Sequence, residues 1–389
     1  MKQFLQIMFV LIFSGFTSYA QSGITVLKGD VIDKETNEGI AFVSIGIEGT
    51  STGTATNPDG HFVLKVSDEN LTKNLYFSAI GYVNVSFPIS DFVQKQNIQI
   101  TLAPQSYKIE AVDVAAESMV LQRILRTASE RIPENYLEGP LNLKIYYEEQ
   151  CSVGDAVGST TKSIVDLYDT KGYSSPGWTD AFKSRKYQTT EYQSDVSPVG
   201  FRDASNSFDE ILEMDVARLS NTIMSPSLLN DYSLKLEDKT LFNRDSVWII
   251  SYAANKPDLA HTGSFYPKSF SGKIYISCSE YAVLRNEIHL TETKENMQGR
   301  SLAVKGYPLT NIQMNITTEY KKVNGKYFLS YINIEKQCQQ PDKQLVYISG
   351  KAVTTGVETK NIKPINMRQY LSEAKTDESF WKNYAAPSY

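Results

Sequence analysis

Short runs of alternating apolar and polar residues, separated by turn signals, recur along most of this 389-residue chain. The pattern is typical of antiparallel β structure, because neighbouring side chains of a strand point to opposite faces. In the segment NPDGHF, Pro58 presets φ for a turn and Gly60 accepts a positive φ. Asn324-Gly325, between two alternating runs, predicts a two-residue hairpin. The sequence therefore predicts a mainly β protein.

The N-terminus has the three parts of a secretory signal peptide. Lys2 supplies the positive charge, residues 4–13 form a short apolar run, and Ser18-Tyr19-Ala20 is a small-x-small cleavage site. We therefore expect residues 1–20 to be removed and the chain to be exported. No later segment has about 18 unbroken apolar residues, so no transmembrane helix is expected.

The strand-like runs fall into two groups. The first group is short and regularly spaced, as in a β-sandwich. The second group is longer and includes two helical patterns, near residues 117–132 and 207–224, which end before Pro133 and Pro226. The predicted division is a signal peptide at 1–20, a sandwich at 21–103, a linker at 104–116, a second β domain at 117–365 and a tail at 366–389.

Four segments of the first group carry a family pattern: GDVIDKETNEGIAFVSIGIEGT, GTATNPDGHFVL, LYFSAIGYVNVSF and IQITLAP. With these segments, residues 24–103 resemble the carboxypeptidase regulatory-like domain, a seven-stranded sandwich related to the transthyretin fold. Such domains begin SusC-type TonB-dependent transporters and many other Gram-negative envelope proteins, and they are non-catalytic. The resemblance implies an adaptor or stability module and not a peptidase.

A second, weaker pattern lies in FSGKIYISCSEYAVLRNEIHL and EYKKVNGKYFLSYINIEK. In its order of elements, the region 117–381 resembles the middle part of large outer-membrane proteins that start with the same domain. It also resembles lipoprotein-carrier (LolA-like) folds, in which a curved antiparallel sheet wraps helices and can hold lipid. The resemblance implies a large curved antiparallel sheet. In the long relatives a transmembrane barrel follows, which we do not expect after DESFWKNYAAPSY.

Charge and cysteine content exclude several classes of protein. The chain has 39 Lys and Arg against 44 Asp and Glu, and no lysine-rich stripe, so no nucleic-acid partner is expected. Cys151, Cys278 and Cys338 lie in strand-like segments without C-x-x-C spacing. An odd number allows at most one internal disulfide, and no disulfide scaffold is implied.

The histidines give little support for catalysis. His289 and Glu292 match the H-x-x-E zinc pair, but no third histidine follows and positions i and i+3 of a strand face opposite ways. His261 and Ser264 are close in sequence, yet a triad also needs an orienting carboxylate. There is no G-x-S-x-G, P-loop or G-x-G-x-x-G. We predict no catalytic residue, no metal site and no cofactor.

Aromatic residues in three predicted loops are the candidate binding residues. Exposed rings on loops above a rigid sheet form a contact surface; the alternative is that they pack down over the ends of the sheet. The candidates are Tyr173, Trp178, Phe201, Phe265 and Tyr266.

The sequence thus predicts a non-enzymatic envelope adaptor or binding protein. Its partner would be a hydrophobic or glycan ligand, or another envelope protein, with possible peripheral association with the outer membrane. We expect it in the periplasm or on the periplasmic face of the outer membrane. Two alternatives stay open: a periplasmic hydrolase using the His261 or His289 region, and a small outer-membrane β-barrel built from residues 141–360. The oligomeric state is not predicted.

Overall fold

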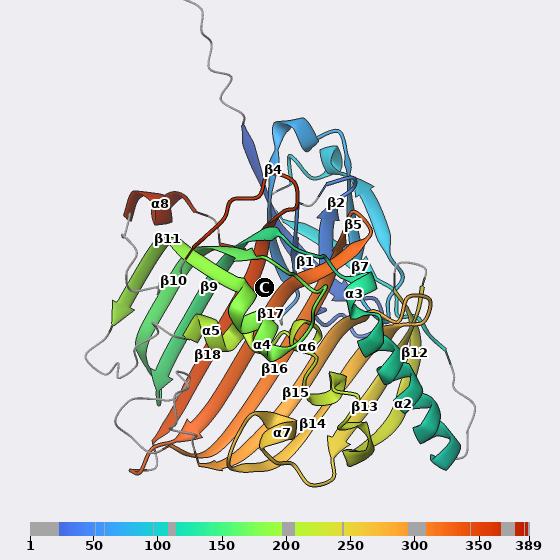
Figure 1. The fold of residues 1–389 in the computed structure, drawn as a ribbon. Coiled ribbons are helices and arrows are strands. Elements are labelled where there is room, and N and C mark those ends of the chain that lie inside the picture. Colours follow the sequence, from blue (N-terminus) through green and yellow to red (C-terminus); the bar gives the residue numbers. More distant parts are fainter. Residues whose placement is uncertain are drawn as a thin grey trace, which may run out of the picture.

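A computed structural model describes most of the chain (Figure 1). The predicted signal peptide, part of the predicted linker, Pro58 and Phe201 lie outside the described residues. The described residues are 23–50, 52–57, 59–95, 97–107, 114–196, 207–242, 245–294, 309–342, 344–366, 378–384 and 386–387.

Seven strands of the described residues form two small sheets near the N-terminus. These sheets face each other as the two layers of a sandwich (Figure 1). One sheet contains β4 (His61–Ser67), β1 (Ile24–Asp33) and β7 (Ile98–Leu102), in that order; the other contains β3 (Gly53–Ala55), β2 (Ser44–Ile47), β5 (Asn74–Ser78) and β6 (Val85–Pro88). Two short 3-10 helices, η1 (Asp68–Asn70) and η2 (Ile89–Asp91), join the strands.

The sandwich has its own apolar core. Alternation along β4 buries Phe62, Leu64 and Val66, and these side chains share one core with Val31 of β1 and Phe77 of the facing sheet. Gly60 has a φ of 85° at the turn before β4, as the turn chemistry predicts.

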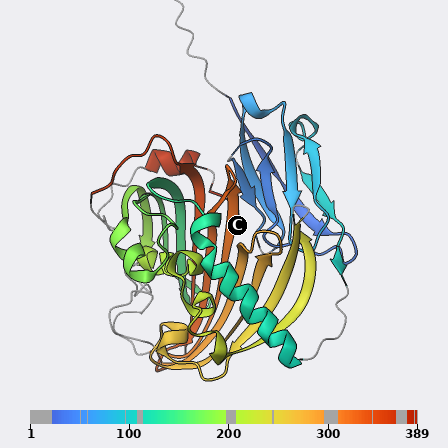
Figure 2. The same ribbon diagram turned by 45° about the vertical axis from the view of Figure 1, so that its right-hand side comes forward.

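The second unit is an 11-stranded antiparallel sheet that curves around the helices (Figures 1 and 2). It is open, with β11 at one edge and β8 at the other. In sheet order its strands are β11 (Arg185–Val196), β10 (Ala156–Asp169), β9 (Leu141–Val153), β18 (Leu345–Glu358), β17 (Lys326–Gln339), β16 (Thr310–Val323), β15 (Val283–Lys294), β14 (Pro267–Ser277), β13 (Asp245–Ala254), β12 (Tyr232–Phe242) and β8 (Ser106–Tyr107).

The fold class predicted from the sequence, a seven-stranded sandwich with a larger curved antiparallel sheet and helices, is confirmed. The hairpin at Asn324-Gly325 is also confirmed: it joins β16 to β17, and both residues have positive φ. Among the described residues, no helix is both long and apolar enough to cross a bilayer.

Helical segments of the second unit other than α8 (Glu378–Asn383) cover the concave face of the large sheet. The longest is α2, which lies across the strands in Figure 2. The helical segments are α2 (Val114–Glu130), α3 (Ile132–Asn135), α4 (Trp178–Ser184), α5 (Ser207–Leu212), α6 (Val216–Leu219), η4 (Thr222–Met224), η5 (Leu229–Asp231), α7 (Leu259–Thr262) and α8 (Glu378–Asn383).

The single helix expected over residues 207–224 is wrong in detail, because the structure divides it into α5, α6 and η4. Asp215 interrupts the helix: its side chain caps α6 by accepting from the Arg218 N–H. Ser220 and Thr222 then take positive φ values of 49° and 51°, which end α6 and separate it from η4. We call residues 207–224 the cover.

The sandwich and the C-terminal helix pack on the convex face of the large sheet. Phe42 of the sandwich contacts Tyr331, at 5.5 Å between ring centroids. From α8, Phe380 and Trp381 pack against the same apolar cluster, and just after the helix Tyr384 stacks on Tyr146. The concave face is therefore separate from the surface that holds the sandwich.

Candidate functional site

A cavity of about 280 Å³ lies between the concave face of the large sheet and the cover; we call it the concave cavity. Four neighbouring strands, β14 to β17, form its floor, and the cover forms its wall. Most of the lining is apolar: Phe270, Ile288, Leu290, Met314 and Ile316 from the floor, and Met214, Val216 and Leu219 from the cover.

Strand alternation explains which side chains reach the concave cavity. On β15, Ile288, Leu290 and Glu292 face inward, whereas His289 points to the exposed convex face. His289 Nδ1 lies 2.8 Å from the Asn315 side-chain oxygen. The two members of the H-x-x-E pair thus lie on opposite faces of the strand, which excludes joint ligation of one metal ion.

Large apolar side chains surround the mouth of the concave cavity. Trp178, at the start of α4, is 51% exposed, and Leu259, at the start of α7, is 46% exposed; both line the cavity. Phe182 is 53% exposed and stacks on Trp178, with the ring centroids 5.5 Å apart. An exposed aromatic pair beside an apolar cavity is a typical feature of a ligand entrance.

The concave cavity also has a polar part. Glu210, Glu292 and Lys336 line it and are buried, and each has a polar or ionic contact. Charged side chains are seldom buried unless they are paired. The position of these three at a cavity wall therefore indicates a preformed binding site. An apolar floor with a polar part at one wall suits an amphiphilic ligand.

A buried ion network fixes the cover to the sheet. Arg185 Nη2 lies 2.6 Å from Asp215 Oδ2, and Arg218 Nε lies 3.2 Å from Asp169 Oδ2. Burial alone would raise the pKa of Asp169, but the guanidinium groups of Arg185 and Arg218 hold it below its usual value. Arg218 also donates to the carbonyl of Ser175, at 2.7 Å. The network therefore joins the cover to β10, β11 and the segment before α4.

Tyrosine hydroxyls complete this network. Tyr173 and Tyr320 donate to the two oxygens of Asp215, at 2.8 and 2.9 Å. Burial raises the pKa of Tyr173 and Tyr320 well above the usual value, and the Asp215 carboxylate adds to the shift. Both tyrosines therefore remain donors at neutral pH. The Asp215 carboxylate, held in this way, places α6 at the wall of the concave cavity.

Helix α7 holds His261 at the edge of the same region. His261 Nδ1 lies 2.7 Å from Asp258 Oδ1, and Nε2 lies 3.3 Å from Asp231 Oδ2. Ser264 Oγ accepts from the N–H of Tyr266 at 3.2 Å. Both ring nitrogens thus face carboxylates, and within the described residues His261 has no hydrogen bond to Ser264. Asp258 also caps α7 by accepting from two backbone N–H groups of that helix.

The structure places the predicted binding residues in different surroundings. Only Trp178 lines the concave cavity. Phe265 and Tyr266 are exposed in the loop after α7, where Lys294 Nζ lies 4.1 Å from the Tyr266 ring centre. Phe201 lies outside the described residues.

An exposed ring was expected at Tyr173, and this expectation is wrong. Tyr173 is 3% exposed and stacks on Tyr136, with the ring centroids 4.9 Å apart. Its loop packs down over the end of the sheet because the Asp215 carboxylate accepts its hydroxyl.

Sequence reasoning missed the floor and the cover of the concave cavity. Alternation in β15 and β16 gives the inward residues, so Leu290 and Met314 could have been found from the pattern. Nothing in the local sequence of residues 214–219 indicates that they form a cavity wall, because this depends on the buried network.

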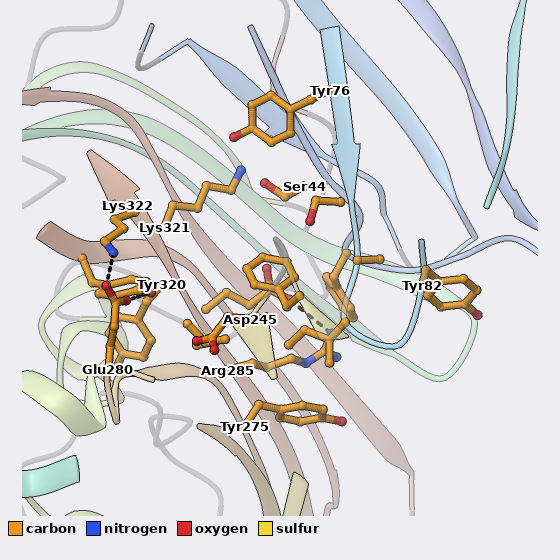
Figure 3. Close-up of a pocket in the computed structure, with 18 of the residues that line it drawn as sticks. Ser44, Tyr76, Tyr82, Asp245, Tyr275, Glu280, Arg285, Tyr320, Lys321 and Lys322 are labelled. Atoms are coloured by element: carbon orange, nitrogen blue, oxygen red, sulfur yellow. Dashed lines mark hydrogen bonds and ion pairs between the residues drawn. The ribbon is translucent and has the colours of Figure 1, made fainter. Parts of the chain in front are cut away.

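A second pocket, of about 470 Å³, lies between the sandwich and the large sheet (Figure 3). We call it the inter-unit pocket. The sandwich contributes Phe42, Ser44 and Tyr76, and the ends of β13 to β17 contribute charged residues that include Asp245, Glu280, Arg285, Glu319 and Lys321.

Arg285 joins the two sides of the inter-unit pocket. Its guanidinium carbon lies 4.5 Å from the Phe42 ring centre and 5.7 Å from that of Tyr275. Arg285 also pairs with Glu287 at 2.8 Å and with Glu319 at 3.2 Å. Phe42 has a φ of 60°, an uncommon value for a bulky residue. Backbone strain of this kind persists only where surrounding contacts fix the residue.

The cysteines and acidic residues suggest no other chemistry. Cys151, Cys278 and Cys338 are free thiols. Burial raises the pKa of the Cys278 thiol to about 11, which makes a poor nucleophile. Within the described ranges, no group of three or more His, Cys, Asp or Glu side chains is placed to hold a metal ion.

The comparison with family models identifies the first unit. Residues 27–114 match the model described as a CarboxypepD_reg-like domain. The sandwich is a CarboxypepD_reg-like domain. This confirms the resemblance found in the sequence for residues 24–103. The matched region of the regulatory-like domain also extends into the predicted linker.

Solved structures similar to this chain include proteins of the lipoprotein-carrier type, the group that the sequence of residues 117–381 resembles. A LolA superfamily protein from Nitrosomonas europaea has 8% identity and a TM-score of 0.22, with 65% of this chain and 96% of that chain covered. An outer membrane lipoprotein-sorting protein domain from Vibrio parahaemolyticus has 10% identity and a TM-score of 0.24, with 65% and 95% covered.

A DUF1329 family protein from Desulfovibrio piger has 8% identity and a TM-score of 0.23, with 65% of this chain and 96% of that chain covered. Likeness at these TM-scores says nothing about what this chain binds. No curated protein matches the chain.

Proposed function

We propose that the protein is a non-enzymatic envelope binding protein that holds the apolar chain of an amphiphile in the concave cavity. The observation that carries the proposal is the lining: apolar side chains from four strands and the cover, beside the buried charges of Glu210, Glu292 and Lys336. Ligand pockets of proteins are mostly apolar with a few polar groups that orient the ligand. At about 280 Å³, the concave cavity has room for one acyl chain rather than for a lipid with several.

The position of the regulatory-like domain supports this proposal. The domain packs on the convex face, through Phe42 on Tyr331 and through Lys321, which donates to the Thr54 carbonyl at 3.1 Å. It therefore leaves the mouth at Trp178 and Leu259 open. We assign this domain the role of an adaptor that contacts an envelope partner, and we place the protein in the periplasm or on the periplasmic face of the outer membrane.

The first experiment measures binding of dodecanoate to the full chain by isothermal titration calorimetry. Met314 lies on the floor of the concave cavity, so Met314→Trp fills it, whereas Gln313 next to it points to the convex face. We expect wild type and Gln313→Trp to bind alike and Met314→Trp to bind at least ten-fold more weakly. Absence of binding to wild type, or equal binding by the two variants, would contradict the proposal.

A second experiment identifies the natural ligand. Protein purified without detergent from the envelope of its source cell is extracted with organic solvent, and the extract is analysed by mass spectrometry. We expect a single-chain amphiphile that is absent from extracts of Met314→Trp. An extract without lipid from the wild type would argue against the carrier form of the proposal.

A further inference from the structure

The inter-unit pocket is built by both parts of the molecule. Ser44 and Tyr76 come from neighbouring strands of the regulatory-like domain, while Lys321 and Asp245 come from β16 and β13 of the large sheet. Neither unit has the complete set of lining residues. Ligand sites of proteins often lie at such domain boundaries, because a concave surface forms where two convex bodies meet.

Lys321 lies at one end of the inter-unit pocket. Its amine extends toward Tyr76 and Ser44 (Figure 3) and donates to the Thr54 carbonyl at 3.1 Å. The Ser44 hydroxyl hydrogen-bonds to the Tyr76 hydroxyl, and the Tyr76 ring lies across Gly46, where a side chain would displace it. A lysine amine beside two hydroxyl groups is a typical setting for a carboxylate or a phosphate.

The charge state of Lys321 agrees with an anion site. Burial lowers the pKa of Lys321 to about 8, although the nearby Glu319 carboxylate acts in the opposite direction. The folded protein therefore pays an electrostatic penalty for this amine, and a bound anion would relieve it.

Asp245 lies in another part of the same pocket (Figure 3). It accepts hydrogen bonds from the Ser277 and Ser279 hydroxyls, the second at 2.8 Å. No basic side chain of the described residues forms an ion pair with Asp245, whereas Glu280 pairs with Lys322 at 2.5 Å. Among the described residues, Asp245 thus presents to the pocket a carboxylate that accepts hydrogen bonds from hydroxyl groups.

We propose that the inter-unit pocket binds a small zwitterion, with its ammonium group against Asp245 and its carboxylate or phosphate against Lys321, Ser44 and Tyr76. The Phe42 ring also lines the pocket and provides an apolar surface for the body of the ligand. Free amino acids, short peptides and phosphoethanolamine share this chemistry. Because both units contribute, the ligand also ties the regulatory-like domain to the large sheet.

The test is calorimetric titration of the full chain with glycylglycine and with phosphoethanolamine. We expect at least one of them to bind, and the better ligand shows whether the site takes a peptide or a headgroup. N-acetylglycine lacks the ammonium charge and glycinamide lacks the carboxylate, so each should bind at least ten-fold more weakly than glycylglycine if that is the ligand. Acetylation or dephosphorylation should weaken phosphoethanolamine likewise. Binding of neither zwitterion, or equal binding of the single-charge analogues, would overturn the proposal.

Variants then assign the two ends. Lys321→Met and Asp245→Asn should each weaken binding at least ten-fold, while Lys321→Arg should stay within a few-fold of wild type. Lys235→Met is the control, because Lys235 is an exposed lysine of the same sheet that pairs with Glu237 and is not among the residues lining the pocket. We expect its affinity to stay within two-fold of wild type.

Dodecanoate binding separates this site from the concave cavity. Lys321→Met and Asp245→Asn should bind dodecanoate as the wild type does, which also shows that they are folded. Unchanged zwitterion affinity in folded Lys321→Met would exclude Lys321 as the anion contact. If the variants lose zwitterion binding but keep dodecanoate binding, the result supports the inter-unit pocket and does not depend on the proposed carrier function. If dodecanoate does not bind to the wild type, thermal unfolding is used instead to show that the variants are folded.

Discussion

The two pockets of this protein differ in how they are built. The concave cavity lies within one unit and has a mostly apolar lining from adjacent strands and the cover. The inter-unit pocket is larger, has many charged and hydroxyl groups beside its apolar lining, and exists only where the regulatory-like domain meets the large sheet. The first therefore depends on the packing of a single core, and the second depends on the docking of two bodies. Substitutions that affect either the packing of the large unit or the docking of the two units can test this difference.

The largest effect is expected in the network that holds the cover. Arg218 is fully buried and bonds to Asp169, Ser175 and Ser184. Arg218→Met leaves buried carboxylate charge uncompensated, so the free energy of unfolding should fall by about 3–5 kcal/mol in urea denaturation.

The matched control for this variant is an exposed ion pair. Lys235 lies 3.0 Å from Glu237 on the surface of the large sheet, and Lys235→Met should cost less than about 1 kcal/mol. If Arg218→Met cost no more than Lys235→Met, the cover would not depend on the network.

The next effect concerns the docking of the two units. Phe42 contacts the Arg285 guanidinium and the Tyr331 ring, so Phe42→Ala should lower the free energy of unfolding by about 2 kcal/mol. Phe42→Gly removes the same ring but relieves the positive φ of 60°, and it should recover roughly 0.5–1 kcal/mol relative to alanine.

Phe182→Ala provides the comparison for these two variants, because Phe182 is an exposed aromatic residue of α4 that stacks on Trp178. It should change stability by less than about 0.5 kcal/mol. Equal stability of Phe42→Ala and Phe182→Ala would mean that the Phe42 ring does not hold the two units together.

The sequence predicts the two pockets to different degrees. Alternation in β15 and β16 fixes which residues face inward, and turn chemistry at Gly60 and Asn324-Gly325 fixes where strands end. The fold class and much of the floor of the concave cavity follow from these local signals. The cover does not, because the break at Asp215 depends on partners such as Arg185 that are distant in sequence.

The inter-unit pocket could not be predicted in this way at all. Thr54 and Lys321 meet across 267 residues of chain, through a backbone carbonyl that has no sequence signature. The burial of Tyr173 could not be predicted for the same reason. Whether this loop tyrosine is exposed or buried depends on the Asp215 carboxylate, which is distant in sequence and accepts its hydroxyl.

A smaller effect is expected from pH. Lys321 has a pKa of about 8 in the folded protein and an ordinary value of 10.5 when exposed. Between these values the unfolded chain binds more protons, so the free energy of unfolding should rise with pH. Because the side chain is partly exposed, we expect a gain of about 1 kcal/mol from pH 8 to 10.

The pH effect is measured as the difference between wild type and Lys321→Met, with Lys322→Met as the control that keeps the gain. Buried tyrosines act in the opposite direction only above the ordinary tyrosine pKa of 10.0, since burial raises the pKa of Tyr82, for example, to about 12. Burial raises the pKa of the Cys278 thiol from 9.0 to about 11, so this thiol also opposes the gain below pH 10. Because this contribution is the same in both proteins, the difference between wild type and Lys321→Met up to pH 10 isolates the lysine. A gain of equal size in Lys321→Met would assign it to another group.

The smallest effect separates two aromatic residues that the sequence did not distinguish. Trp178 and Phe265 are equally exposed, at 51%, but only Trp178 lines the concave cavity. Trp178→Ala should weaken dodecanoate binding by about three-fold, roughly 0.6 kcal/mol, with little change in stability. Phe265→Ala should leave the affinity unchanged. If both variants bound dodecanoate as the wild type does, the ligand would lie below the mouth, in contact with the floor alone. If Phe265→Ala were the weaker binder, the ligand would enter beside α7, and the loop after that helix would belong to the site.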